Sequence, residues 1–413
     1  MKNIQLHVGI HKTATTSIQE TLFTNKVLPK YMHQYYYPKS WSSNHGSVLL
    51  KLSDAHYNLP YLVLKEQNHY INKLHKINML NEVASISADT LVISAEILCV
   101  ASEETLEMVK KYFESIYESV NISIMIYVRN PVSHFTSTFQ QATKTIFYCA
   151  KNDLEMFVEL YCNEKNPLQK FIHIFGQENI KVVRFEHTLT HPFGPVGYFY
   201  EKCLHVAPND LKNIQFKKCN ESMSQIATDM CLFINQKIPM HNKNRTGFSN
   251  ERRLNDLDVI AKCISGEKYK LSKQERLNLL NQCGNLLRHL KDTFDIDYLT
   301  EDMRQAILMD TEPNHEPSCQ NITEIKRIFY QLDFNIQEGL IHYLREINNI
   351  YCGDAQQYIE ITQLIHQLEK KQKKWSHKIM TIVMKQYRKL RNLYTLSVPF
   401  LYYVRFKIKR LTT

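Results

Sequence analysis

The stretch IQLHVGIHKTATTSIQETLFTN, residues 4–25, contains the elements that decide the fold. Apolar side chains alternate along its first part, at Ile4, Leu6, Val8 and Ile10. This alternation predicts a buried β-strand. A small, hydroxyl-rich turn from Gly9 to Thr16 follows it, and Ser17 to Asn25 has the spacing of a helix. The first 25 residues are therefore expected to form a strand, a loop and a helix in immediate succession.

The same alternation of strands and helices continues downstream. Short apolar runs predict further strands at Thr90–Ser94, Ile122–Val128 and Ile180–Phe185. Helical patterns lie between them, at Ser102–Val120, from Pro131 onward and at Asp153–Phe175. Strands separated by helices of about 12 residues or more indicate a parallel sheet covered on both faces. We therefore expect an α/β fold, a three-layer, doubly wound parallel sheet with P-loop-like character.

Helical patterns dominate beyond about Asn220, which predicts a helical C-terminal extension. Glu312–Asn321 contains two prolines and is the best candidate for a linker. We expect an α/β domain over residues 1–310, a helical extension over 311–369 and a basic amphipathic tail over 370–413.

The positive charge of the chain is concentrated in its tail. The net charge is +10, but residues 370–413 hold 13 of the 51 basic residues and no acidic one, so residues 1–369 carry −3. A nucleic-acid-binding main domain is disfavoured, because such domains carry their own basic stripe. In the tail, apolar residues recur at helical spacing and aromatic residues follow around Pro399. Either the tail attaches to an anionic membrane surface, or it packs on the main domain or a partner.

The cysteines and the N-terminus indicate the compartment. The ten cysteines are dispersed and include no C-x-x-C pair, so no structural metal site is expected. The N-terminus has no pattern typical of a signal peptide, and no apolar run approaches about 18 residues. We expect a cytoplasmic protein with reduced thiols, soluble or peripheral on the inner face of the membrane.

The loop after the first strand has the chemistry of an anion cradle. Between Gly9 and Ser17 it combines Lys12, four hydroxyl side chains and the start of a helix. Helix-start N–H groups, hydroxyls and a lysine together suit a phosphate or sulfate. The order differs from a Walker A loop, in which lysine follows glycine and directly precedes Ser or Thr. The alternative is a capped turn that binds nothing, although capping explains only one or two of the hydroxyls.

A second candidate anion site follows the strand at 122–128. Arg129 lies at its end and Ser137 lies eight residues later, on the following helix. Ligands collect at the carboxyl ends of parallel strands, so Arg129 is expected on the same sheet edge as Lys12. An arginine that serves only in a structural ion pair is the alternative.

Both motifs resemble those of one family, the sulfotransferases that use 3′-phosphoadenosine 5′-phosphosulfate (PAPS). HVGIHKTATTSIQ, residues 7–19, is similar to the 5′-phosphosulfate loop of the bacterial carbohydrate-type members related to heparan sulfotransferases, H-x-G-x-H-K-T-G-T-T-S-I-Q. Arg129 and Ser137 match the spacing of the family's 3′-phosphate motif. Two residues depart from the pattern: Ala14, where glycine is usual, and His134, where a second arginine often stands.

The resemblance implies sulfuryl transfer from PAPS to a hydroxyl of a carbohydrate acceptor, a surface polysaccharide or its precursor. It places the donor on His11, Lys12, Thr13, Ala14, Thr15, Thr16, Ser17, Arg129 and Ser137. No metal is required by this scheme. Lys12 would neutralise charge on the leaving phosphate, and either His45 or Glu96 would accept the acceptor's proton. The family uses either residue type; His45 is preferred here for its position early in the chain.

Two other functions remain compatible with the sequence. A P-loop kinase or NTPase would use the same cradle for ATP. A non-catalytic, membrane-associated adaptor would act through residues 370–413 alone.

Overall fold

The computed structural model describes residues 2–10, 12–25, 28–41, 44–52, 80–144, 157–158, 162, 167–218, 222–237, 257–309, 311–315, 318–350 and 359–374. The chain falls into two compact units. The first comprises Met1–Gln225 and Glu267–Asn314, and the second comprises Ile226–Gly266 and His315–Thr413. This grouping is discontinuous along the chain, whereas the division expected from the sequence is linear.

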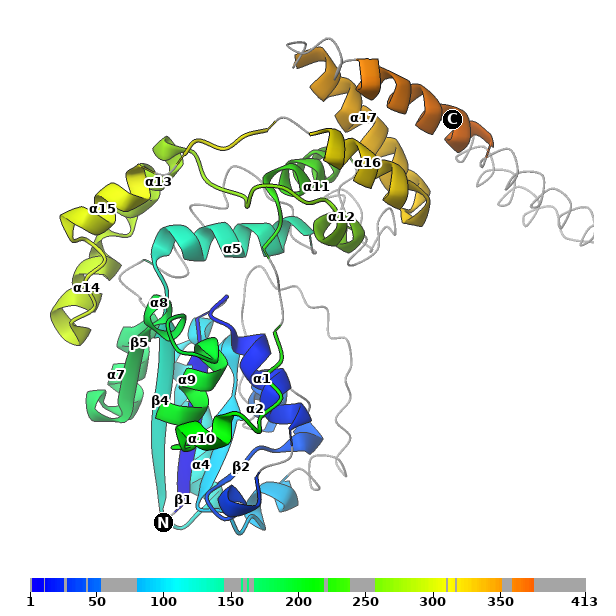
Figure 1. Ribbon diagram of the computed structural model, residues 1–413. Coiled ribbons are helices and arrows are strands. Elements are labelled where there is room, and N and C mark those ends of the chain that lie inside the picture. Colours follow the sequence, from blue (N-terminus) through cyan, green and yellow to red (C-terminus); the bar gives the residue numbers. More distant parts are fainter. Residues whose placement is uncertain are drawn as a thin grey trace, which may run out of the picture. The chain divides into compact units, whose positions relative to one another are not determined.

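The described strands of the first unit form one five-stranded parallel sheet (Figure 1). They are β1 (Lys2–Gly9), β2 (Tyr35–Tyr36), β3 (Thr90–Ser94), β4 (Val120–Val128) and β5 (Ile180–Arg184). Their order is β2-β3-β1-β4-β5, with Ile4 opposite Leu91 on one side and Ile122 on the other. The strand order reverses direction at β1, so the loop that follows β1 lies where open sheets of this kind bind ligands.

Helices cover both faces of the sheet (Figure 1), which confirms the expected α/β class. Those of the first unit are α1 (Thr15–Thr24), α2 (Gly46–Leu52), α4 (Glu103–Ile116), α5 (Pro131–Lys144), α7 (Pro167–Phe175), α8 (Phe185–Thr188), α9 (Gly194–Lys202), α10 (Pro208–Leu211), α13 (Lys273–Gln282), α14 (Gly284–Phe294) and α15 (Glu301–Leu308). On one face, α1 and α9 pack against Val92 and Tyr127. On the other, α4 and α7 pack against Leu6 and Ile93. Neighbouring residues of a strand thus enter different cores, as side-chain alternation requires.

The second unit is helical in its described part, as expected for the C-terminal extension. Its helices are α11 (Gln225–Lys237), which starts at the unit boundary, α12 (Asp258–Cys263), α16 (Cys319–Ile328) and α17 (Phe334–Ile350); residues 359–374 are also helical. Apolar side chains such as Ile325, Leu344 and Leu364 are fully buried. Of the described helices, none combines the length and the apolar character needed to cross a membrane. Residues 375–413 of the tail lie outside the described residues.

Two local differences from the sequence prediction have physical causes. The helical pattern of Ser272–Asp292 predicts one helix, but the structure has two, because the chain turns at Cys283 before Gly284 begins α14. The edge strand β2 was not predicted, because two residues are too few to show periodicity.

Candidate functional site

The loop between β1 and α1 turns sharply at a glycine. A Cβ at Gly9 would lie 1.9 Å from Thr15 Cγ2 and 2.9 Å from Thr13 Oγ1, so any other residue would force these side chains to move. Lys12 and Ala14 both adopt left-handed backbone conformations, with φ of 67° and 62°. The expectation that position 14 favours glycine therefore has a structural reason, because this region costs an L-residue about 1–2 kcal/mol.

The four hydroxyls of the loop divide into two groups. Thr13 is fully buried, and its hydroxyl donates to the Ile10 carbonyl oxygen over 2.5 Å, so this side chain holds the loop together. Thr15, Thr16 and Ser17 begin α1 and line a cleft. Ala14 occupies the N-cap position, and its methyl group cannot accept a hydrogen bond from the first turn of α1. The backbone N–H groups of the first turn of α1 are suited to bind an anion. His11 lies outside the described residues.

Arg129 lies directly beside this loop. Its Nη1 donates to the Lys12 carbonyl oxygen over 2.8 Å, and its Nε donates to Ser133 Oγ over 3.0 Å. The guanidinium also stacks over the Phe185 ring, 5.2 Å from its centroid. Burial lowers the pKa of Arg129, and nearby Glu186 opposes that effect. The two candidate anion sites predicted from the sequence therefore meet at one edge of the sheet.

Lys12 is a partly desolvated cation. Its Nζ donates to Gln141 Oε1 over 3.3 Å. The pKa of Lys12 is lowered to about 8, mainly by burial and then by the positive charges of Lys144 and Arg129, while Glu96 opposes the shift. Because burial disfavours the charged form of Lys12, an incoming anion stabilises this cation more than it would stabilise a lysine in water.

The main cleft is a cavity of about 750 Å³ within the first unit. Polar and charged residues contribute Lys12, Thr15, Thr16, Ser17, Glu96, Arg129, Ser137, Gln141, Lys217, Lys218 and Ser222 to its lining. The rings of Phe193 and Phe216 also line it and stack with centroids 5.1 Å apart. Sequence reasoning did not single out Phe193, Lys217 and Lys218 as cleft residues; the two adjacent lysines just after Phe216 were the available signal.

The two candidates for the base differ in position. Glu96 begins the 3₁₀ helix η3 (Glu96–Val100) and lines the main cleft. His45 is fully buried, is not among the cleft-lining side chains, and its Nε2 donates to the Pro38 carbonyl oxygen over 2.8 Å. Its ring stacks on Tyr37 at 4.1 Å. Aromatic packing encloses the His45 side chain, whereas Glu96 is the candidate that lines the main cleft.

Other predicted features have structural positions as well. Ser137 lines the main cleft and also an adjoining second cleft of about 690 Å³, which shares Arg129 and Ser222 with it. His134 is buried, packs edge-on against Phe157 at 4.9 Å, and lines neither cleft. No group of three or more His, Cys, Asp or Glu side chains in the described part of the chain could hold a metal ion.

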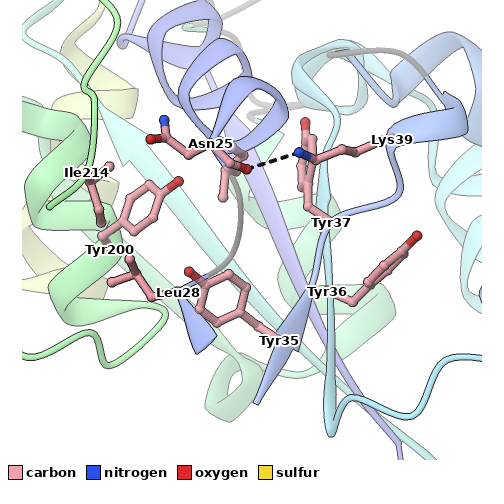
Figure 2. Close-up of a pocket in the computed structure, with 9 residues that line it drawn as sticks. Asn25, Leu28, Tyr35, Tyr36, Tyr37, Lys39, Tyr200 and Ile214 are labelled. Carbon is pink, nitrogen blue, oxygen red and sulfur yellow. Dashed lines mark hydrogen bonds between the residues drawn. The ribbon is translucent and has the colours of Figure 1, made fainter. Parts of the chain in front are cut away.

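A smaller cavity of about 110 Å³ lies at the other end of α1 (Figure 2). Tyr35, Tyr36, Tyr37 and Tyr200 surround it, and Lys39 closes one side by donating to the Asn25 carbonyl oxygen over 3.0 Å. Sites for drug-sized ligands or cofactors measure about 300–1,000 Å³, so this cavity is too small for a nucleotide. The main cleft has the required size.

Comparisons with known proteins give limited information. No family model matches the chain, and no curated protein matches it in sequence. Among solved structures, a sulfotransferase from Alicyclobacillus acidocaldarius is similar, with 13% identity and a TM-score of 0.41 over 74% of this chain and 99% of that one. A likeness of this extent does not bear on the chemistry of the cleft, which has to be argued from the residues.

Proposed function

We propose that this chain is a sulfotransferase that transfers a sulfuryl group from PAPS to a hydroxyl of a carbohydrate. The observation that carries the proposal is the hydrogen bond from Arg129 to the Lys12 carbonyl oxygen. It brings the two cations expected at opposite ends of one nucleotide into a single cleft of about 750 Å³. The motif resemblance supplies the choice of donor.

The cleft divides naturally between the two ends of the donor. The 5′-phosphosulfate would bind at Lys12, at the hydroxyls of Thr15, Thr16 and Ser17, and at the uncapped start of α1. The 3′-phosphate would bind at Arg129 and Ser137. The stacked pair Phe193 and Phe216 offers an aromatic surface for the adenine ring.

The chemistry follows from which groups face the cleft. The acceptor oxygen forms a bond to sulfur while the bond from sulfur to the phosphate oxygen breaks, and 3′-phosphoadenosine 5′-phosphate leaves. Glu96 would take the proton of the acceptor hydroxyl. Lys12 would stabilise the negative charge that grows on the leaving phosphate.

Nucleotide binding and sulfate transfer test the proposal together. We expect 3′-phosphoadenosine 5′-phosphate to bind to the full chain in calorimetry without a metal ion, and Lys12→Ala or Arg129→Ala to weaken it about ten- to a hundredfold. Lys111→Ala is the matched control, because this lysine is exposed on α4 and forms an ion pair with Glu107 at the surface. Transfer from ³⁵S-labelled PAPS to a panel of glycans then identifies the acceptor.

The same experiment separates the other functions. Binding of ATP with Mg²⁺ and none of the phosphoadenosine nucleotide would indicate a kinase or NTPase instead. A protein that binds neither nucleotide, and acts only through residues 370–413, would be an adaptor.

Attachment of the tail to a membrane is a separate proposal, based on its 13 basic residues. We expect the full chain to sediment with vesicles containing 30% phosphatidylserine at low salt and to be released at 0.5 M NaCl, as screening requires. Equal binding to purely zwitterionic vesicles would contradict this. Removing residues 375–413 is expected to abolish sedimentation and leave nucleotide binding unchanged.

A further inference from the structure

The backbone on either side of Arg129 is held by two side chains, Glu186 and Tyr298. The N–H of Asn130 donates to Glu186 Oε1 over 2.9 Å. The Tyr298 hydroxyl donates to Glu186 Oε2 over 2.8 Å and lies 3.3 Å from the Val128 carbonyl oxygen. One carboxylate and one phenol therefore clamp the end of β4 on both sides of the arginine.

The tyrosine of this clamp is buried, whereas the Glu186 side chain is 30% exposed. Tyr298 follows α14 and is only 1% exposed. Burial, followed by the nearby charge of Glu186, raises the pKa of Tyr298 far above its ordinary value, so the hydroxyl stays a donor. The guanidinium of Arg184 lies 4.8 Å from the Tyr298 ring centroid, and its Nε is 3.7 Å from Glu186 Oε2. The negative charge of Glu186 is thereby compensated before any anion enters.

The clamp also determines which way Arg129 points. Two of its five N–H donors are engaged in the described part of the chain, at the Lys12 carbonyl and at Ser133. Phe185, the residue next to Glu186, covers one face of the guanidinium. If the strand end shifted, these contacts would lengthen together, and the N–H groups left for a ligand would change direction.

We propose that Tyr298 and Glu186 are positioning residues that set the preference for a nucleotide carrying a 3′-phosphate. This inference rests on the proposed function, in which Arg129 binds that phosphate. Neither side chain lines the main cleft, although Glu186 lines the adjoining second cleft, and Tyr298 lines neither. They act by fixing the orientation of Arg129, so their effect on affinity is confined to the 3′-phosphate of the ligand.

The test compares two nucleotides that differ only in the 3′-phosphate: 3′-phosphoadenosine 5′-phosphate and adenosine 5′-monophosphate. Calorimetry on the full chain is expected to show tighter binding of the first to the natural protein. Tyr298→Phe and Glu186→Gln should each reduce that preference about five- to thirtyfold, with the affinity for the monophosphate unchanged. Glu186→Gln keeps the shape of the side chain and an oxygen for the Asn130 N–H.

Tyr31→Phe is the matched control. Its hydroxyl is also part-buried and donates to a carboxylate, Asp210 Oδ2, over 2.8 Å, but it lies far from Arg129 near the other end of α1. We expect a comparable loss of thermal stability and no change in nucleotide preference. A purely structural role for Tyr298 would give the same result as this control.

The outcomes distinguish a failure of the proposed function from a failure of the role proposed for Tyr298 and Glu186. If the natural protein shows no preference for the 3′-phosphate, the proposed function is overturned, and this inference with it. If the natural protein prefers it and both folded variants retain the full preference, or weaken both nucleotides equally, only the clamp inference is overturned. Should one variant fail to fold, the other decides, because each removes a different partner of the same hydrogen bond.

Discussion

Replacing Ala14 by glycine should stabilise the protein, although most substitutions in a binding loop do the opposite. Ala14 has φ of 62° and ψ of 18°. Glycine adopts the same left-handed conformation without the penalty of about 1–2 kcal/mol that an L-residue has there. Glycine also makes the unfolded chain more flexible, which lowers the free energy of unfolding by about 0.4–1 kcal/mol. The balance for Ala14→Gly is a gain of about 0.5–1 kcal/mol in the free energy of unfolding.

The assay is thermal unfolding followed by calorimetry, with the transition of the first unit compared between variants. A gain of this size raises the midpoint by about 1–4 °C for a domain of this class. Ala84→Gly is the matched control, because Ala84 is exposed and helical and therefore has a negative φ. It has no strain to lose and should be destabilised by about 0.4–1 kcal/mol. The reasoning is refuted if the two variants shift the midpoint in the same direction by similar amounts.

Three further predictions concern the same loop. Gly9→Ala should unfold or displace the loop, because its Cβ would lie 1.9 Å from Thr15 Cγ2. Gly284→Ala is the control and should be tolerated, because no atom lies within 4 Å of the added Cβ. Thermal melts followed by circular dichroism would contradict this if they gave the two variants the same stability. The affinity for 3′-phosphoadenosine 5′-phosphate should fall as pH rises through about 8, because Lys12 loses its charge there in the free protein. Calorimetry between pH 6.5 and 9.5 checks this, with Lys12→Arg expected to show no such fall and a flat profile for the natural protein counting against it. Thr13→Val should cost about 1 kcal/mol by leaving the Ile10 carbonyl unpaired, while Thr13→Ser should cost clearly less, as measured by urea unfolding.

Much of the sheet could be predicted from local patterns. The strand at Thr90–Ser94 was predicted with its observed bounds, and those around Ile4, Ile122 and Ile180 within two residues, because buried parallel strands are short apolar runs bounded by polar turns. The proximity of Lys12 and Arg129 could also be predicted, since both follow the carboxyl ends of parallel strands.

Contacts between residues far apart in the sequence could not be predicted from local patterns. Tyr298 reaches the end of β4 across 170 residues, and nothing near Tyr298 in the sequence signals this. The burial of His45 depends on its packing against Tyr37 and Trp41, which a local pattern does not reveal. Thr13 looks like a ligand-binding hydroxyl in the sequence, and only its hydrogen bond to Ile10 shows that it is internal. Residues 226–266 group with the C-terminal helices through contacts that are equally non-local.

The bond between Arg129 and the Lys12 carbonyl joins positions 117 residues apart, and this separation bears on biosynthesis. A ribosome that has made only the first strand, loop and helix has produced every hydroxyl of the cradle, but not the arginine that braces it. The nascent chain acquires a complete pocket only after β4 has emerged and paired with β1. Early intermediates are therefore unable to capture nucleotide, and ligand can aid maturation only at its late stages.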